Sequence, residues 1–152
     1  MHVVLVEPEI PQNTGNIVRT CAATGLHLHL VKPLGFSTED RYLKRAGLDY
    51  WHLVNVNYHE NFAELQKKYQ NNNFFYATTK AKKFYTDVSY GPDDFLVFGP
   101  ETRGLPEDLL AVNSSNCIRL PMISESRSLN LSNSVAIIVY EALRQQNFPN
   151  LV

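Results

Sequence analysis

The stretch IRLPMISESRSLNLSNSVAIIVYEALRQQ, residues 118–146, contains the pattern that decides the fold. Ile118–Leu120 is a short apolar run of the kind that forms a buried strand. A loop rich in serine and asparagine follows, and from Leu131 to Gln146 apolar residues recur at the spacing of one helix face. The stretch therefore predicts a strand, a polar loop and a long helix with a broad apolar face.

The same alternation of strands and helices extends back toward the N-terminus. Further strands are predicted at residues 3–6, 26–31, 74–78 and 95–98. Helices are predicted from Gly15 or Asn16 to Gly25, and at residues 38–46, 60–69 and 106–112. Strands that alternate with helices indicate an α/β fold, with a mostly parallel sheet and helices on both of its faces.

Length and charge limit what the chain can be. Its 152 residues predict one domain, residues 1–152, large enough to bury a core without disulfides. The 14 Lys and Arg against 15 Asp and Glu give a formal net charge of −1, which excludes a domain-wide positive field, so nucleic-acid binding needs local patches.

The N-terminal residues contain no signal-peptide core, and no apolar run approaches the roughly 20 residues of a membrane span. We therefore expect a cytoplasmic protein that does not contact a membrane. Its two cysteines, Cys21 and Cys117, are far apart in the sequence and lack any metal-ligand spacing, so we expect two buried, reduced thiols.

Several common catalytic motifs are missing from the sequence. The chain has no G-x-G-x-x-G, G-x-x-x-x-G-K-[ST], H-E-x-x-H or G-x-S-x-G motif. Its five histidines do not have the spacing of metal ligands, so we expect no metal site. Parallel sheets bind ligands in the loops that follow their strands, and here those loops hold most of the glycine, proline, asparagine and serine.

Two of these loops have both a functional and a structural interpretation. The segment Asn13–Arg19, NTGNIVR, either binds an anion such as phosphate at a helix start or is ordinary Asn capping with a surface arginine. The segment Phe98–Pro106, FGPETRGLP, is held rigid by two glycines and two prolines. Its Glu101 and Arg103 either pair on the surface or form part of a site, and we favour the site.

The third loop, Ser126–Asn133 (SRSLNLSN), offers hydroxyl and amide groups at the start of the last helix. These groups form either a redundant helix cap or the polar rim of a pocket. With Leu120, Met122 and Leu129 as apolar walls, such a pocket suits adenine and ribose. The residues alone leave both interpretations open.

In this order, NTGNIVR, FGPETRGLP, and IRLPM with SRSLNLSNSVAIIVYEALRQ resemble the three motifs of the SPOUT methyltransferases, over almost the whole chain. Within that superfamily the chain is similar to the minimal TrmL-type branch, as EPEIPQNTGNIVRTCAATG, RAGLDYW and the short length indicate. The resemblance implies a C-terminal trefoil knot, a rare feature among folds. It also implies S-adenosylmethionine as cofactor, S-adenosylhomocysteine as product, and 2′-O-methylation of the wobble cytidine or uridine of leucine tRNAs.

The resemblance also assigns roles to single residues. Cofactor contacts are expected from Ala77, Thr78, Gly99, Glu101, Leu120, Met122, Ser128 and Leu129. Catalysis and substrate positioning are assigned to Asn13, Arg19, Glu101 and Asn130. Family accounts make Arg19 a general base. Because a guanidinium rarely gives up its proton, we expect Arg19 to orient phosphate and ribose instead, while Glu101 or Asn130 fixes the geometry.

Two kinds of partner are expected. RNA contacts are predicted from two basic clusters, for which a solvated charged surface is the alternative: Lys80, Lys82 and Lys83, and Arg41, Lys44 and Arg45. The apolar stripe of the last helix and the helix of the first motif predict a symmetric homodimer, as the resemblance also implies. Alternative functions are methylation of another tRNA position or of rRNA, and RNA binding without catalysis.

Overall fold

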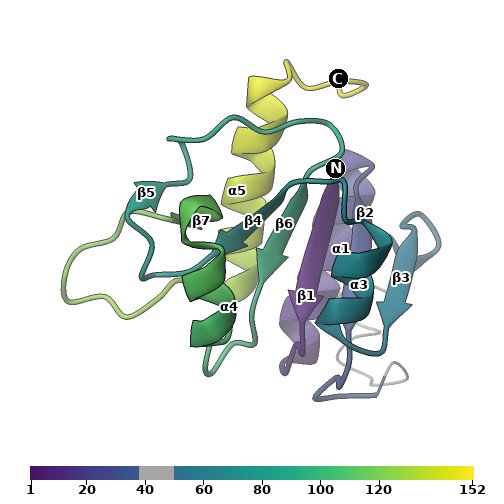
Figure 1. Ribbon diagram of the computed structural model, residues 1–152. Coiled ribbons are helices and arrows are strands. Elements are labelled where there is room, and N and C mark those ends of the chain that lie inside the picture. The colour runs from purple at the N-terminus through teal and green to yellow at the C-terminus, as the bar shows by residue number, and fades with distance from the viewer. Residues whose placement is uncertain (38–49) are drawn as a thin grey trace.

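The computed structural model describes residues 1–37 and 50–152. In these parts the strands form a seven-stranded sheet in the order β3-β2-β1-β6-β4-β7-β5, and every pairing is parallel (Figure 1). The strands are β1 (His2–Val6), β2 (His27–Val31), β3 (Val56–His59), β4 (Phe74–Ala77), β5 (Lys83–Phe84), β6 (Phe95–Phe98) and β7 (Cys117–Arg119). The predicted parallel sheet is confirmed, whereas the helix predicted at residues 38–46 lies outside the described residues.

The described helices are α1 (Pro11–Thr24), α3 (Phe62–Lys68), α4 (Glu107–Val112), the 3-10 helix η1 (Ser114–Asn116) and α5 (Leu131–Gln145). The prediction that α1 begins at Gly15 or Asn16 is wrong. The helix begins at Pro11, because proline at the first helical position already has a helical φ and needs no N–H. It ends as predicted at Gly25, which has a left-handed φ of 70°. None of the described helices is long and apolar enough to cross a membrane.

Helices cover both faces of the sheet, as predicted. In Figure 1, α1 and α5 lie behind the sheet, and α3 and α4 lie in front of it. Neighbouring residues of a strand point to opposite faces. In β6, accordingly, Leu96 packs with Ile17 of α1 and Val139 of α5, whereas Val97 belongs to the front core, which contains Leu65 of α3. The two apolar cores hold the central strands in place from both sides.

The sequence did not predict the two edge strands, β3 and β5. In β3 the sequence is VNYH, in which polar residues replace the apolar run of a central strand. The second, β5, has only two residues, both exposed, and is recognisable only through its pairing with β7. An edge strand is paired on one side and needs little burial, so it lacks the hydrophobic signal that identified the central strands.

Three histidines form a hydrogen-bonded chain across β1, β2 and β3. His2 Nδ1 lies 3.0 Å from His29 Nε2, and His29 Nδ1 lies 2.9 Å from His59 Nε2. Burial lowers the pKa of His29 to about 3 and that of His2 to about 4, and it also lowers the pKa of His59. The three histidine side chains are therefore uncharged at neutral pH, and they pack in the front core.

The order of the sheet brings four loops together. Strands β1, β6, β4 and β7 are successive neighbours, and all run in the same direction. The loops that follow them therefore emerge at one edge of the sheet, although they are far apart in the sequence. These are the loops in which the sequence predicted the site.

Candidate functional site

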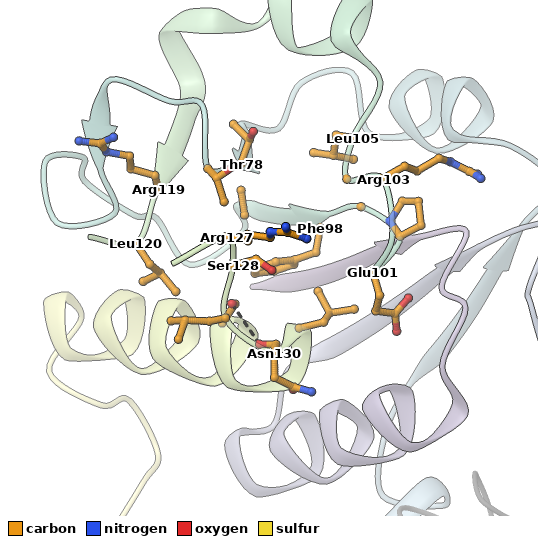
Figure 2. Close-up of a pocket in the computed structure, with 18 of the residues that line it drawn as sticks. Thr78, Phe98, Glu101, Arg103, Leu105, Arg119, Leu120, Arg127, Ser128 and Asn130 are labelled. Atoms are coloured by element: carbon orange, nitrogen blue, oxygen red, sulfur yellow. Dashed lines mark hydrogen bonds between the residues drawn. The ribbon is translucent and has the colours of Figure 1, made fainter. Parts of the chain in front are cut away.

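A cavity of about 600 Å³ opens at the carboxyl ends of β4, β6 and β7 (Figure 2). Its walls come from the loops after these strands, the first turn of α1 and the start of α5. They include every residue predicted to contact a cofactor and three of the four predicted for catalysis: Asn13, Ala77, Thr78, Gly99, Glu101, Leu120, Met122, Ser128, Leu129 and Asn130. The fold thus brings the three sequence motifs to one place.

Close backbone contacts shape the loop after β6. A Cβ atom on Gly99 would lie 2.4 Å from both the Gly104 carbonyl carbon and the Leu105 nitrogen, a distance that real Cβ atoms essentially never show. Gly104 has a φ of 71°, in the left-handed region that favours glycine, and its N–H donates to the Pro100 carbonyl oxygen over 2.9 Å. The two glycines let the loop fold back on itself and form one wall of the cavity.

Three of the predicted catalytic residues form one hydrogen-bonded network. The Glu101 carboxylate accepts hydrogen bonds from the Glu9 N–H at 2.8 Å, the Ile10 N–H at 3.2 Å and Asn13 Nδ2 at 3.1 Å. Asn13, which is only 5% exposed, accepts in turn at Oδ1 from Asn130 Nδ2 over 2.9 Å. The network fixes the orientation of both amide side chains relative to the carboxylate.

Asn130 also caps helix α5. Its Oδ1 accepts from the Ser132 N–H at 2.9 Å and from Ser132 Oγ at 2.7 Å, and Ser134 Oγ donates to the Asn130 carbonyl oxygen at 3.1 Å. Ser128 and Leu129, immediately before it, line the cavity. The same segment therefore caps the helix and also forms a wall of the cavity, so the two structural roles do not exclude each other.

The sequence did not predict a reciprocal clasp between the loops after β1 and β6. Glu9 donates its N–H to Glu101, while its carboxylate accepts from Thr102 N–H at 3.1 Å and Thr102 Oγ1 at 2.8 Å. Arg103 pairs with Glu7 rather than with Glu101, which had been considered as its surface partner. One sequence feature could have indicated this contact. Two short charged loops, EPE at residues 7–9 and PETR at residues 100–103, each follow a buried strand.

Arg19, the fourth residue predicted for catalysis, lies apart from this network. It is exposed on α1 and does not line the cavity. Its guanidinium carbon lies 4.9 Å from the centre of the Tyr50 ring, a cation–π arrangement. At 3.6 residues per turn, Arg19 points about 120° away from Asn13 around the helix axis. One copy of α1 therefore presents Asn13, but not Arg19, to this cavity.

The lysines predicted to contact RNA differ in their surroundings. Lys80 lines the cavity and pairs with Glu107 of α4. Lys83 Nζ donates to the Ser115 carbonyl oxygen at 2.8 Å. Lys82 is exposed and has no hydrogen bond or ion pair with any described residue. The other predicted cluster, Arg41, Lys44 and Arg45, lies outside the described residues.

Two arginines that the sequence analysis did not select, Arg119 and Arg127, also line the cavity. The guanidinium carbon of Arg119 lies 5.0 Å from the centre of the Phe84 ring, and Arg119 Nε is buried without a hydrogen-bond partner. Arg127 has no ion pair or hydrogen bond within the described part of the chain. A single arginine, whether at the end of a strand like Arg119 or in a loop like Arg127, carries no sequence signal that separates it from an ordinary surface residue.

The walls combine apolar and polar groups. Phe98, Leu105 and Ile118 are buried, whereas Thr78 and Glu101 present polar side chains. Such a mixture, at this volume, is typical of a site for a small organic ligand. Among the described residues, no group of three or more His, Cys, Asp or Glu side chains is placed to hold a metal ion.

Comparison with known proteins identifies the family of this chain. Residues 1–140 match the SpoU rRNA methylase family. The chain belongs to that family. It is 57% identical to a Bacillus subtilis relative, over 99% of this chain and 96% of that protein. It is 47% identical to the tRNA (cytidine(34)-2′-O)-methyltransferase of Escherichia coli strain K12, over 100% of this chain and 98% of the relative.

Two solved structures have a fold similar to that of this chain. One, from work on the 2-OH methylation of C/U34 on tRNA, superimposes with a TM-score of 0.91 at 43% identity and covers 96% of this chain and 95% of that one. Another is an AdoMet-bound rRNA methyltransferase from Sinorhizobium meliloti, with a TM-score of 0.82 at 25% identity. It covers 94% of this chain and 55% of that one.

Proposed function

We propose that this SpoU-family chain transfers a methyl group from S-adenosylmethionine to the ribose 2′-hydroxyl of the wobble nucleotide, cytidine or uridine 34, in leucine tRNA isoacceptors. The observation that carries the proposal is the cavity in which residues of all three motifs meet. The names of close relatives support the choice of nucleotide and of hydroxyl. The leucine tRNAs rest on the resemblance to the TrmL-type branch.

The cavity fits S-adenosylmethionine in size and chemistry. Its apolar walls, with Leu120 and Met122, suit the adenine ring, and the hydroxyl and amide groups near Ser128 suit the ribose. Gly99 lets the main chain of its loop form a wall directly, since a Cβ there would collide with backbone. The proposed contacts are those expected from the sequence: Ala77, Thr78, Gly99, Glu101, Leu120, Met122, Ser128 and Leu129.

S-adenosylmethionine, when bound, supplies an already activated sulfonium methyl group. The protein must align the 2′-hydroxyl with that methyl group and allow the hydroxyl proton to leave. We assign alignment to Glu101, Asn13 and Asn130, because their mutual hydrogen bonds fix all three side chains at the cavity wall. We assign Arg19 the orientation of an RNA phosphate and ribose, a role for which a permanent positive charge and a planar guanidinium are suited.

The central test is mass spectrometry of tRNA nucleosides from a deletion strain, before and after complementation with this chain. The proposal requires that 2′-O-methylated wobble cytidine or uridine disappears and then returns. If complementation restores methylation only in rRNA, or only at another tRNA position, the proposed wobble-nucleotide substrate is wrong and that other nucleotide is the substrate. A second test uses Arg19→Lys, which keeps the charge but loses the planar fork. Near-normal transfer by that variant would remove any specific role of the guanidinium.

We propose that two copies pair through α1 and α5. These helices pack on each other behind the sheet, and α5 leaves Ile137 39% exposed and Tyr140 47% exposed. Exposed apolar side chains on one helix are a suitable centre for a symmetric interface. Sedimentation at micromolar concentration should give a dimer, and a single species with the monomer mass would refute this arrangement.

We propose that one domain, residues 1–152, binds both the cofactor and the tRNA, and that it acts in the cytoplasm. RNA contacts are assigned to Lys80, which lines the cavity, and to Lys82 and Lys83, together with Arg41, Lys44 and Arg45. The proximity of Lys80 to the cavity supports the first cluster, because an RNA whose ribose enters the cavity must bring its phosphates to the rim.

We also propose that the C-terminal part forms the trefoil knot of the SPOUT fold. Its support is the way α5 is bound to the segment before β6: Tyr90 N–H donates to Gln145 Oε1 at 3.0 Å, and Gln145 Nε2 donates to the Val88 carbonyl oxygen at 3.0 Å. Stretching single molecules from both ends tests the knot. A knotted chain gives a shorter unfolded contour length than 152 extended residues, and a full-length contour would exclude it.

A further inference from the structure

The charges that line the cavity are not balanced within the protein. Its charged wall residues are Lys80, Glu101, Arg103, Arg119 and Arg127. Lys80 and Arg103 are ion-paired with glutamates, and Arg119 stacks on a phenylalanine ring. Glu101 accepts three hydrogen bonds. Within the described residues, Arg127 is the wall cation that has no ion pair, hydrogen bond or ring contact.

The position of Arg127 is specific. It lies in the loop between β7 and α5, directly before Ser128 and Leu129, which also line the cavity. Figure 2 shows its side chain extending into the cavity toward Phe98, while Glu101 lies at another wall. A guanidinium at this place has donors available for an anion and no acidic residue of the described chain to occupy them.

We propose that Arg127 binds the carboxylate of the methionine portion of the cofactor. This inference rests on the proposed function, and it names the residue that recognises one end of the ligand. S-adenosylmethionine carries one anionic group, its carboxylate, and two cationic groups, its ammonium and sulfonium. The cavity has the complementary arrangement, with an unpaired cation at Arg127 and a carboxylate at Glu101, so the two charges define the direction in which the ligand binds.

The same charges place the sulfonium away from Arg127. A guanidinium next to a sulfonium repels it, whereas Glu101 attracts it. Glu101 is also bonded to Asn13, whose neighbour in the network is Asn130, so the attracted end lies beside the residues assigned to alignment. Anchoring the carboxylate at Arg127 therefore directs the methyl group toward the part of the cavity where the ribose hydroxyl is aligned.

The test compares two ligands by titration calorimetry. S-adenosylhomocysteine contains the carboxylate, and 5′-methylthioadenosine keeps the adenosine and sulfur but lacks the amino-acid end. Arg127→Gln should weaken S-adenosylhomocysteine binding about 10- to 100-fold, as expected for a lost charged hydrogen bond, and leave 5′-methylthioadenosine unchanged. Arg127→Lys should restore part of the loss. The control is Lys67→Gln, which removes one positive charge from α3, a helix that does not line the cavity. It should leave the binding affinity for both ligands unchanged.

Three results would overturn the assignment. The first is unchanged S-adenosylhomocysteine binding by Arg127→Gln with unchanged tRNA binding, and the second is an equal loss of affinity for both ligands. The third is unchanged ligand binding together with a lower salt dependence of tRNA binding, by about one counterion, which would assign Arg127 to an RNA phosphate. If the unmodified protein binds neither ligand, the proposed function itself fails, and that outcome is distinct from the other three.

Discussion

Gly99→Ala should damage the cavity more than its single methyl group suggests. The added Cβ would lie 2.4 Å from two backbone atoms, of Gly104 and Leu105, and 2.9 Å from the Gly104 carbonyl oxygen. Ordinary van der Waals contact begins at 3.4 Å, so the loop must move by about 1 Å. No flexible side chain is available to give way, because all three atoms belong to the main chain.

The size of the effect follows from that displacement. Overpacking of this kind costs roughly 1–3 kcal/mol, which corresponds to a fall in the melting temperature Tm of about 2–12 °C for a chain of this size. The moving segment is a wall of the cavity and carries Glu101. A misplacement of about 1 Å in a site can reduce the rate about 100-fold, so we expect methyl transfer to fall by about that factor.

The matched control is Gly25→Ala at the end of α1. Gly25 has a φ of 70° and nothing within 4 Å of its ideal Cβ, so alanine there is strained but does not collide with any atom. That strain costs roughly 1–2 kcal/mol far from the cavity. Both variants should lower Tm, but only Gly99→Ala should also weaken S-adenosylhomocysteine binding in calorimetry. Normal Tm and normal binding in Gly99→Ala would refute the argument from backbone contact.

Three other predictions can be checked separately. Asn130→Asp keeps an oxygen for the α5 cap but loses the amide that donates to Asn13. Because the buried Asn13 loses a hydrogen bond worth about 1 kcal/mol, Tm should fall by about 2–4 °C while methyl transfer falls about tenfold; a lower Tm with an unchanged transfer rate would make Asn130 purely structural. Since burial lowers the pKa of His29 to about 3, the unfolded chain binds more protons below pH 6.5. The free energy of urea unfolding should therefore fall as the pH drops from 6.5 toward 4, and a constant value over this range would contradict the buried histidine chain. Lys82→Glu with Lys83→Glu should weaken tRNA binding and lower its salt dependence, and unaltered binding would exclude this patch.

The sequence was sufficient for the central strands and for the main contents of the site. Phe95–Phe98 was predicted with its observed bounds, because a fully buried strand needs a continuous apolar run. Gly25 and Asn130 were informative for a similar reason: left-handed backbone and helix caps each select a few residue types. Local physical requirements of this kind leave a clear pattern in the sequence.

Contacts between distant segments left no such pattern. The clasp joins Glu9 to Thr102 across 93 positions, and each residue alone is an ordinary loop residue. The chain from His2 through His29 to His59 depends on the register of three parallel strands, and one of those strands, β3, was not predicted. Such contacts follow only once the order of the sheet is known.

We propose that the paired cations around the cavity let a nearly neutral chain bind RNA. Lys80 is paired with Glu107, and Arg103 with Glu7, and these side chains are largely exposed, Glu7 less so. Exposed ion pairs contribute little stability, so a phosphate can replace the carboxylate at little cost. The formal charge of −1 therefore does not measure the charge that an RNA meets. In the absence of RNA, the carboxylates of Glu107 and Glu7 hold these two cations in place at the cavity wall.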